Sequence, residues 1–379
     1  MKLSVVDEFH CYEIKEGKEL NVIITILAFL LMLNVIVIIH EAGHFFAARS
    51  FGVHCHEFSI GMGPAIYQKQ GKNTLFSIRA LPIGGYVMMA GEEDGSQSED
   101  SEDDWLAKVP ESERLNFKPK WQQVIIMAAG VFMNFVLAFL IFIGLMAARG
   151  YVVEPAIPVI DSLTEGYPAK EAGLMPGDQI VKIVAEDGTV CIPETTDELS
   201  EFLAFNPGES TFTIERDGEN FDVKMTPHKD DETQMVLLGF TSTSPVRQIS
   251  FLEAIPEGIK YGLDAGGMVF RTFGQLFQGK GFESLSGPVG IYKMTDTVVS
   301  QGLLPYISLF AILSLNIGIF NLLPIPALDG GRILIIALES IFRRKIPTKI
   351  VEGIIIASFV LIFGLMIFST YNDIVRLFF

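Results

Sequence analysis

Charged side chains are scarce in this chain of 379 residues. Only 19% of the residues are Asp, Glu, Lys or Arg, whereas 49% are hydrophobic. This balance is typical of an integral membrane protein with room for one additional soluble domain. Basic residues are the scarcer charged class, and the resulting net charge of −17 argues against nucleic acid as a partner.

Cysteine is also rare. Cys11, Cys55 and Cys191 are far apart in the sequence, so they cannot form a disulfide framework or a zinc site of four cysteines. The first residues lack the basic stretch and the small-residue cleavage site of a signal peptide. We therefore expect residues 1–20 to be an extracytoplasmic N-terminal extension that is followed by a retained membrane helix.

Long apolar runs, in contrast, are abundant, and four of them are long enough to cross a bilayer as helices. They are residues 21–48, 124–147, 303–323 and 350–368. Lys and Arg are concentrated after the first run and between the third and fourth runs, which predicts that these two segments lie on the cytoplasmic side. Both termini and the large segment after the second run would then lie outside the cytoplasm.

The segments that connect these runs differ in character. Residues 52–91 are rich in glycine and β-forming residues, which predicts a small membrane-proximal sheet, and an acidic loop follows at 92–104. Residues 151–240 alternate short β-rich pieces with turn signals and predict the soluble domain. In residues 241–302, hydrophobic side chains recur at nearly helical spacing. This favours an amphipathic helix on the outer membrane surface over a helix packed on the soluble domain.

The most informative motif lies at the end of the first apolar run. His40-Glu41-Ala-Gly-His44 places two histidines on one face of a helix, where both imidazoles can bind a single Zn²⁺. Glu41 lies beside them and can take a proton from a water that the metal activates. Because ionisable residues are costly within a membrane, this placement predicts a metalloprotease whose chemistry takes place in the lipid or at its edge.

A third metal ligand is needed, because a catalytic zinc normally has three protein ligands and one open position. The best candidate is Asp329, which follows the third apolar run on the same predicted side of the membrane as the histidine motif. We expect Pro324, Pro326 and the Gly330-Gly331 pair to break the helix there, so that the Asp329 carboxylate can turn inward.

Together these motifs resemble the site-2 proteases, a family of intramembrane zinc metalloproteases, and within it the bacterial regulator-of-sigma-E protease type. The resemblance covers nearly the whole chain and rests on His40 to His44, Pro82 to Tyr86, Gly130 to Asn134, Gly287 to Ile291, Asn321 to Gly331 and one PDZ-like domain at 151–240. Some members of the family have two PDZ domains, whereas this chain has one.

The resemblance implies an architecture and a location. The fold would be a polytopic α-helical membrane protein with four transmembrane helices, a membrane-proximal β-sheet and one extracytoplasmic PDZ-like α+β domain. The divisions would be 1–20, 21–150 with the first two spans, 151–240, the amphipathic segment 241–302, and 303–379 with the last two spans. The protein would cross the bacterial cell membrane several times, with its active site near the cytoplasmic side.

The resemblance also implies the zinc chemistry. His40, His44 and Asp329 would bind one zinc ion, and Glu41 would act as the general base on the attacking water. Substrates would be single-span membrane proteins, either anti-sigma factors already trimmed by an upstream site-1 protease or remnant signal peptides. The PDZ-like domain would act as a docking surface or as a size filter.

Substrate-binding residues are implied in the same way. Asn321 would hold the substrate backbone by hydrogen bonds and unwind its helix, with an interhelical hydrogen bond as the alternative. Gly130 and Asn134 are a second pair of candidates, for which close helix packing is an equal alternative. Residues 73–89 could pair with the extended substrate by strand addition.

Other interpretations stay open. A different class of membrane endopeptidase with His-Glu-x-x-His would take its third ligand, a Glu or His, from a later helix. A catalytically silent scaffold would bind client proteins through the PDZ-like domain, but such a relative would be expected to lose Glu41 or a metal ligand, and none is lost. A transporter would be expected to show repeated spans, which the sequence does not.

Overall fold

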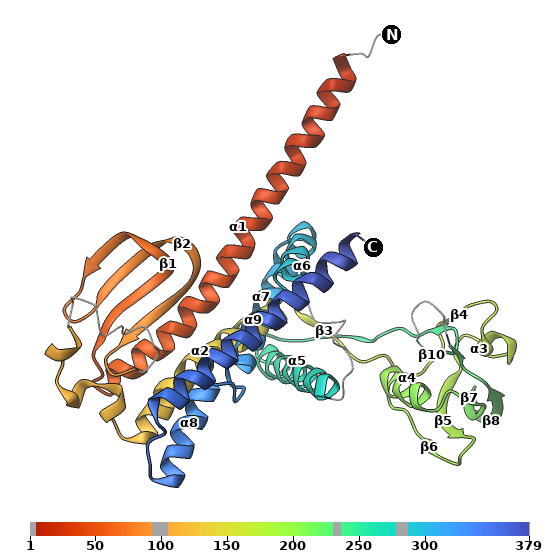
Figure 1. Cartoon of the computed structure of the whole chain (residues 1–379). Helices are drawn as coiled ribbons and strands as arrows, with labels where there is room; N and C mark the ends of the chain where they lie inside the picture. Colours follow the sequence, from red (N-terminus) through yellow and green to blue (C-terminus); the bar gives the residue numbers. More distant parts are fainter. Residues whose placement is uncertain (1–4, 93–104, 230–235, 278–286, 379) are drawn as a thin grey trace. The chain divides into compact units, whose positions relative to one another are not determined.

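The structure is a computed structural model that describes residues 5–92, 105–229, 236–277 and 287–378 (Figure 1). It consists of two compact units, one formed by Met1–Leu145 and Ile255–Phe379 and the other by Met146–Ala254. Apart from Glu92, the predicted acidic loop at 92–104 lies outside the described residues.

The first unit is mainly helical. Its helices are α1 (Val5–Ser50), α2 (Lys120–Arg149), α5 (Ala254–Phe277), α6 (Pro288–Gln301), α7 (Leu303–Asn321), α8 (Asp329–Phe342) and α9 (Thr348–Phe378). Within the described residues, the segments long and apolar enough to cross a membrane are Val22–Ser50, Lys120–Arg149, Leu303–Leu322 and Lys349–Val375. These match the four predicted apolar runs. The residues before the first run continue the helix of α1 (Figure 1).

The membrane-proximal sheet follows directly from the end of α1. Gly52 has a φ of 69°, a left-handed conformation that residues with a Cβ disfavour, and its amide donates a hydrogen bond to the carbonyl of Arg49. Gly52 thus ends the helix in the way that glycine commonly does. The chain then turns back into β1 (Cys55–Gln70) and β2 (Leu75–Met89), which pair as an antiparallel sheet. The sheet predicted for residues 52–91 is therefore present, and it lies close to α1 (Figure 1).

The two long strands curl around each other. Phe58 of β1 is paired with both Val87 and Phe76 of β2, so the first half of β1 lies between the two halves of β2. The side chain of Asn34, in α1, donates a hydrogen bond to the carbonyl of Pro82 in β2. This bond attaches the sheet to the middle of the first membrane span.

A buried charge holds the sheet together from within. Glu57 is 6% exposed and accepts hydrogen bonds from Arg79 Nη2 at 2.7 Å and from the Tyr86 hydroxyl at 2.9 Å. Burial and the hydrogen bond to Glu57 raise the pKa of Tyr86 to about 12, so the hydroxyl stays protonated and keeps donating. The carboxylate is thus paired on both oxygens, as a buried charge requires.

The segment after α7 differs from the prediction. Gly330 and Gly331 do not break a helix; they form part of the first turn of α8, which begins at Asp329. A Cβ on Gly330 would overlap the carbonyl of Leu322, and one on Gly331 would overlap that of Ile325. The glycines therefore allow α8 to start directly against the preceding loop. The sequence patterns did not predict α8 itself.

The helix predicted between residues 241 and 302 is present as α5. Its buried face is a ridge of small residues, and Cβ atoms on Gly258 and Gly262 would overlap Ile143 and Phe139 of α2. Small residues allow such close backbone approach between helices in membranes. The other faces of α5 expose large hydrophobic side chains. The placement of α5 on the membrane surface remains a prediction.

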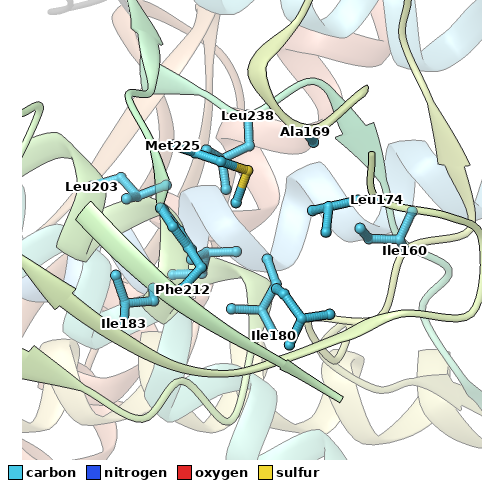
Figure 2. Packing of buried hydrophobic residues seen from close by; sticks show 11 residues of the cluster. Ile160, Ala169, Leu174, Ile180, Ile183, Leu203, Phe212, Met225 and Leu238 are labelled. Carbon is cyan, nitrogen blue, oxygen red and sulfur yellow. The ribbon is translucent and has the colours of Figure 1, made fainter. Parts of the chain in front are cut away.

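The second unit is an α+β structure. Its elements are β3 (Tyr151–Val153), β4 (Ser162–Leu163), α3 (Pro168–Glu171), β5 (Gln179–Ala185), β6 (Val190–Cys191), α4 (Thr196–Phe205), β7 (Ser210–Arg216), β8 (Glu219–Met225), β9 (His228–Lys229), β10 (Val236–Leu237), β11 (Phe240–Thr241) and β12 (Val246–Gln248). The largest sheet has the order β6-β5-β7-β8. Figure 2 shows its core, in which Ile180, Ile183 and Phe212 are completely buried.

One buried ion pair stabilises this second unit. Asp178 is 1% exposed and accepts hydrogen bonds from Arg216 Nε at 2.6 Å, from Arg216 Nη2 at 2.7 Å and from the Met175 amide at 2.8 Å. The Arg216 bonds hold the pKa of Asp178 below its usual value, although burial opposes the shift. The carboxylate therefore favours the folded state whenever it is ionised.

We expect Asp178→Asn to destabilise the second unit by about 2 kcal/mol, because Arg216 would lose a charged partner that accepts two bonds. Since the folded-state pKa is lowered, the contribution is complete above the unfolded value of about 4 and is lost as the pH falls through the folded value. Hydrogen exchange of the β5 and β7 amides in the full chain would measure this. Glu209→Gln is the control, because its ion pair with Lys224 is exposed. Equal losses in both variants would contradict the prediction.

Candidate metal centre

Three predicted ligands come together in the first unit. His40 Nε2 lies 3.1 Å and His44 Nε2 lies 3.4 Å from Asp329 Oδ2, and the two imidazole nitrogens are 3.2 Å apart. The two histidines come from α1 and Asp329 is the first residue of α8. All three are largely buried, with side-chain exposures of 10%, 7% and 14%. Among the described residues this is the only cluster of three such side chains that could hold a metal ion.

The geometry of these atoms fits a zinc ion. In a tetrahedral site with metal–ligand distances of 2.0–2.2 Å, the ligand atoms are about 3.4 Å from one another. The three observed separations lie close to that value. His44 Nδ1 is 2.8 Å from the carbonyl of Ile126, so this nitrogen carries the proton and Nε2 presents a lone pair to the centre.

The charge on Asp329 supports the same interpretation. Burial raises the pKa of this carboxyl, but the hydrogen bonds and charges of His40 and His44 outweigh burial and hold the pKa below its usual range. A carboxylate oxygen that faces two imidazole nitrogens at these distances requires a proton or a metal ion between them, and a bound zinc would fill that position.

Asn134 lies against the first histidine. It is completely buried in α2, and its side-chain amide is 3.4 Å from His40 Nδ1, while its Oδ1 has no hydrogen-bond partner. The nitrogen and oxygen of an amide are assigned from the surrounding hydrogen bonds. Rotating the amide would let Oδ1 accept the proton of His40 Nδ1 and would leave Nε2 free for the metal. The contacts thus favour the packing alternative for Asn134 over a direct substrate contact.

Gly130 lies against the second histidine. A Cβ at this position would overlap the Nε2, Cε1 and Cδ2 atoms of His44. A glycine of α1 makes a similar close contact with α2, since a Cβ on Gly43 would overlap the carbonyl of Ala129. The two glycines let α1 and α2 approach closely enough to place His44 over α2. This role of Gly43 was not predicted; the position of the glycine inside the histidine motif was the available signal.

The predicted base lies beside the sheet. Glu41 is half-buried, and the backbone of Val87 in β2 forms a hydrogen bond with its carboxylate. The charges of His40, His44 and Asp329 also act on Glu41, which places it next to the metal ligands. A carboxylate in this position could accept a proton from a water bound at the centre. The contact with Val87 was not predicted.

Asn321 is the last residue of α7 and is partly exposed. It stands where the chain leaves the third span and turns toward Asp329. Its predicted contact with substrate stays a prediction.

Comparison with known proteins identifies the family. The protein-family model described as peptidase family M50 matches residues 28–365, so the chain belongs to this family, the site-2 proteases. The zinc metalloprotease RasP of Shouchella clausii (strain KSM-K16) is 31% identical over 93% of this chain and 99% of that protein. The regulator of sigma-W protease RasP of Bacillus subtilis (strain 168) is 30% identical with the same coverage. A relative from Staphylococcus aureus (strain N315) is 31% identical, with 95% of this chain and all of that protein covered.

These findings establish the class of the protein. It is a membrane protein and a zinc metalloprotease of the site-2 protease family, as the sequence motifs predicted. The convergence of His40, His44 and Asp329 agrees with zinc as the metal.

We expect Gly130→Ala to lower zinc affinity by about tenfold or more, because the new methyl group would displace the His44 imidazole. The measurement is the zinc that the purified chain retains during competition with a chelator. Gly144→Ala is a matched control in the same helix, since nothing lies within 4 Å of a Cβ there. Equal zinc retention by both variants would show that His44 does not depend on this close approach.

Proposed function

We propose that this chain is an intramembrane zinc endopeptidase that cuts the transmembrane segments of single-span membrane proteins. The observation that carries the proposal is the convergence of His40, His44 and Asp329 at the ends of apolar spans. Ionisable groups at such depth are costly and are retained for function. A metalloprotease centre in this position would act on peptide bonds within the lipid or at its edge.

Each residue of the centre would have a separate role in the reaction. His40, His44 and Asp329 would hold the metal. A bound zinc would lower the pKa of a water molecule and polarise the scissile carbonyl. Glu41 would take the proton from the attacking water and pass it to the nitrogen of the leaving peptide. Asn134 would orient His40, and the carbonyl of Ile126 would orient His44.

Substrate binding needs an unwound segment, because a helical peptide bond is shielded by its own hydrogen bonds. Asn321, at the end of α7, would hold the extended backbone. Strand β2 would add further hydrogen bonds by strand addition. The hydrogen bond between Val87 and Glu41 supports this role for β2, because it places the strand next to the base.

The basic ends of the spans support an orientation. Arg49 lies at the end of the first span, and the link between the third and fourth spans carries Arg343, Arg344 and Lys345. Under the rule for positive charges these ends would face the cytoplasm. The metal centre would then lie near the cytoplasmic side, and the second unit and both termini would lie outside.

The second unit would act as a PDZ-like docking domain. A groove of about 350 Å³ runs between α4 and the segment that contains β10 and β11. It is lined by Leu199 and Leu203 from the helix and by Leu238 and Phe240 from the opposite segment. An extended peptide could add to such a strand edge while its side chains enter the groove.

The names of the relatives support a substrate class. The Bacillus subtilis relative is a regulator of sigma-W protease. By analogy the substrate would be an anti-sigma factor that an upstream site-1 protease has already trimmed, with remnant signal peptides as a second possibility. The lipid bilayer is the other partner. The presence of Glu41 together with all three ligands favours this function over a silent scaffold.

Glu41→Gln should retain zinc and lose cleavage, because the amide cannot accept the proton of the attacking water. The measurement is zinc content together with cleavage of a transmembrane signal-peptide substrate in detergent. Glu111→Gln, at an exposed position, is the control for the loss of one carboxylate. Cleavage by the Glu41 variant would remove this residue from the role of base.

Asp329→Asn should lose zinc during dialysis, since a neutral amide is a far weaker ligand than a carboxylate. Asp296→Asn makes the same chemical change on α6, where the carboxylate accepts a hydrogen bond from Thr25. This control should keep its zinc. Full metal content in the Asp329 variant would rule out the assignment of the third ligand.

A further inference from the structure

A cavity of the first unit opens at the basic ends of two membrane spans. Its volume is about 380 Å³, and it lies between the first turns of α2, the length of α8 and the first turns of α9. The proposed metal ligands do not line it. Any ligand of this cavity would therefore bind separately from the zinc.

One half of the cavity extends along the hydrocarbon part of the spans. On α2 it is lined by Lys120, Gln123 and Met127, which share one helix face, and on α9 by Val351 and Ile355. From Lys120 to Met127 a helix rises about 10 Å. The lining changes along this distance from charged at the start of the span to apolar within it. Such a gradient matches the boundary between lipid headgroups and acyl chains.

The other half of the cavity carries an excess of positive charge. Lys120 pairs with Glu339 at 2.6 Å, and Arg332 pairs with Glu92. Lys345 also lines the cavity and is exposed. Among the described residues that line the cavity, three cations and two carboxylates leave one unit of positive charge. This matches the single negative charge of a phosphodiester headgroup.

We propose that this cavity binds one anionic phospholipid of the surrounding bilayer. Lys345 faces its phosphate, and the apolar wall that includes Val351 and Ile355 contacts the upper part of an acyl chain. Basic pockets between membrane helices are known to recognise anionic lipid headgroups. A soluble anion would leave the apolar half without a partner, and a zwitterionic lipid would leave the excess charge uncompensated.

The test is native mass spectrometry of the full chain, purified in micelles that contain phosphatidylglycerol and phosphatidylcholine in equal amounts. We expect one phosphatidylglycerol to remain bound in preference to phosphatidylcholine. Lys345→Ala should lower the retained fraction about fivefold, which corresponds to one interfacial cation. Lys349→Ala removes the same charge outside the cavity and should leave retention unchanged.

A second pair of variants tests the apolar half. Ile355→Trp should fill the inner end of the cavity and displace the lipid, whereas Ile356→Trp, at a neighbouring position that is 64% exposed, should not.

Three outcomes would overturn the proposal: equal retention of the two lipids, equal effects of Lys345→Ala and Lys349→Ala, or full retention in Ile355→Trp. A peptide as the natural occupant would give the first of these. None of the four variants touches the proposed metal ligands, so loss of lipid with normal zinc content separates this site from the proteolytic function.

Discussion

The close approach of α1 and α2 is the constraint on which the metal centre depends. Gly43 lies against the backbone of Ala129, and Gly130 lies beneath the imidazole of His44. Any larger side chain at either glycine would separate the helices and move His44 away from His40 and Asp329. In a bilayer, where apolar side chains gain little from contacting each other instead of lipid, such backbone proximity is a main source of helix association. The same contact therefore packs the spans and sets the ligand geometry.

The second requirement is that polar groups near the centre find partners without water. His44 Nδ1 forms a hydrogen bond with the carbonyl of Ile126, and His40 Nδ1 lies within hydrogen-bond distance of the side-chain amide of Asn134. The backbone carbonyl of Asn134 in turn accepts a hydrogen bond from Ser314 of α7. A line of hydrogen bonds thus runs from α1 through α2 to α7, and it gives both histidines a partner within the protein, as a low-dielectric environment demands. Ser314 is therefore linked to the metal centre through this line of contacts.

Much of the site could be predicted from local patterns, because its chemistry is local. The spacing of His40 and His44 on a helix needs no tertiary information, and the four apolar runs are visible as composition. Asp329 could be predicted from its depth after the third span. The roles of Asn134 and Gly43 could not be predicted in the same way, because they depend on which face of α2 meets α1. The contact between Val87 and Glu41 depends on the register of a curled sheet, which the sequence does not specify.

The prediction that the glycine pair after Asp329 breaks a helix was wrong for a physical reason. Glycine disfavours a helix interior, so Gly330 and Gly331 predicted a break. In the structure they lie in the first turn of α8, where the absence of a Cβ allows the helix to begin against the carbonyls of the preceding loop. The cost of glycine in the helix is therefore offset by the placement of Asp329, whose carboxylate is fixed by the start of a rigid element. A ligand on a flexible loop would lose more entropy when it binds the metal, so the helix start favours a preorganised centre.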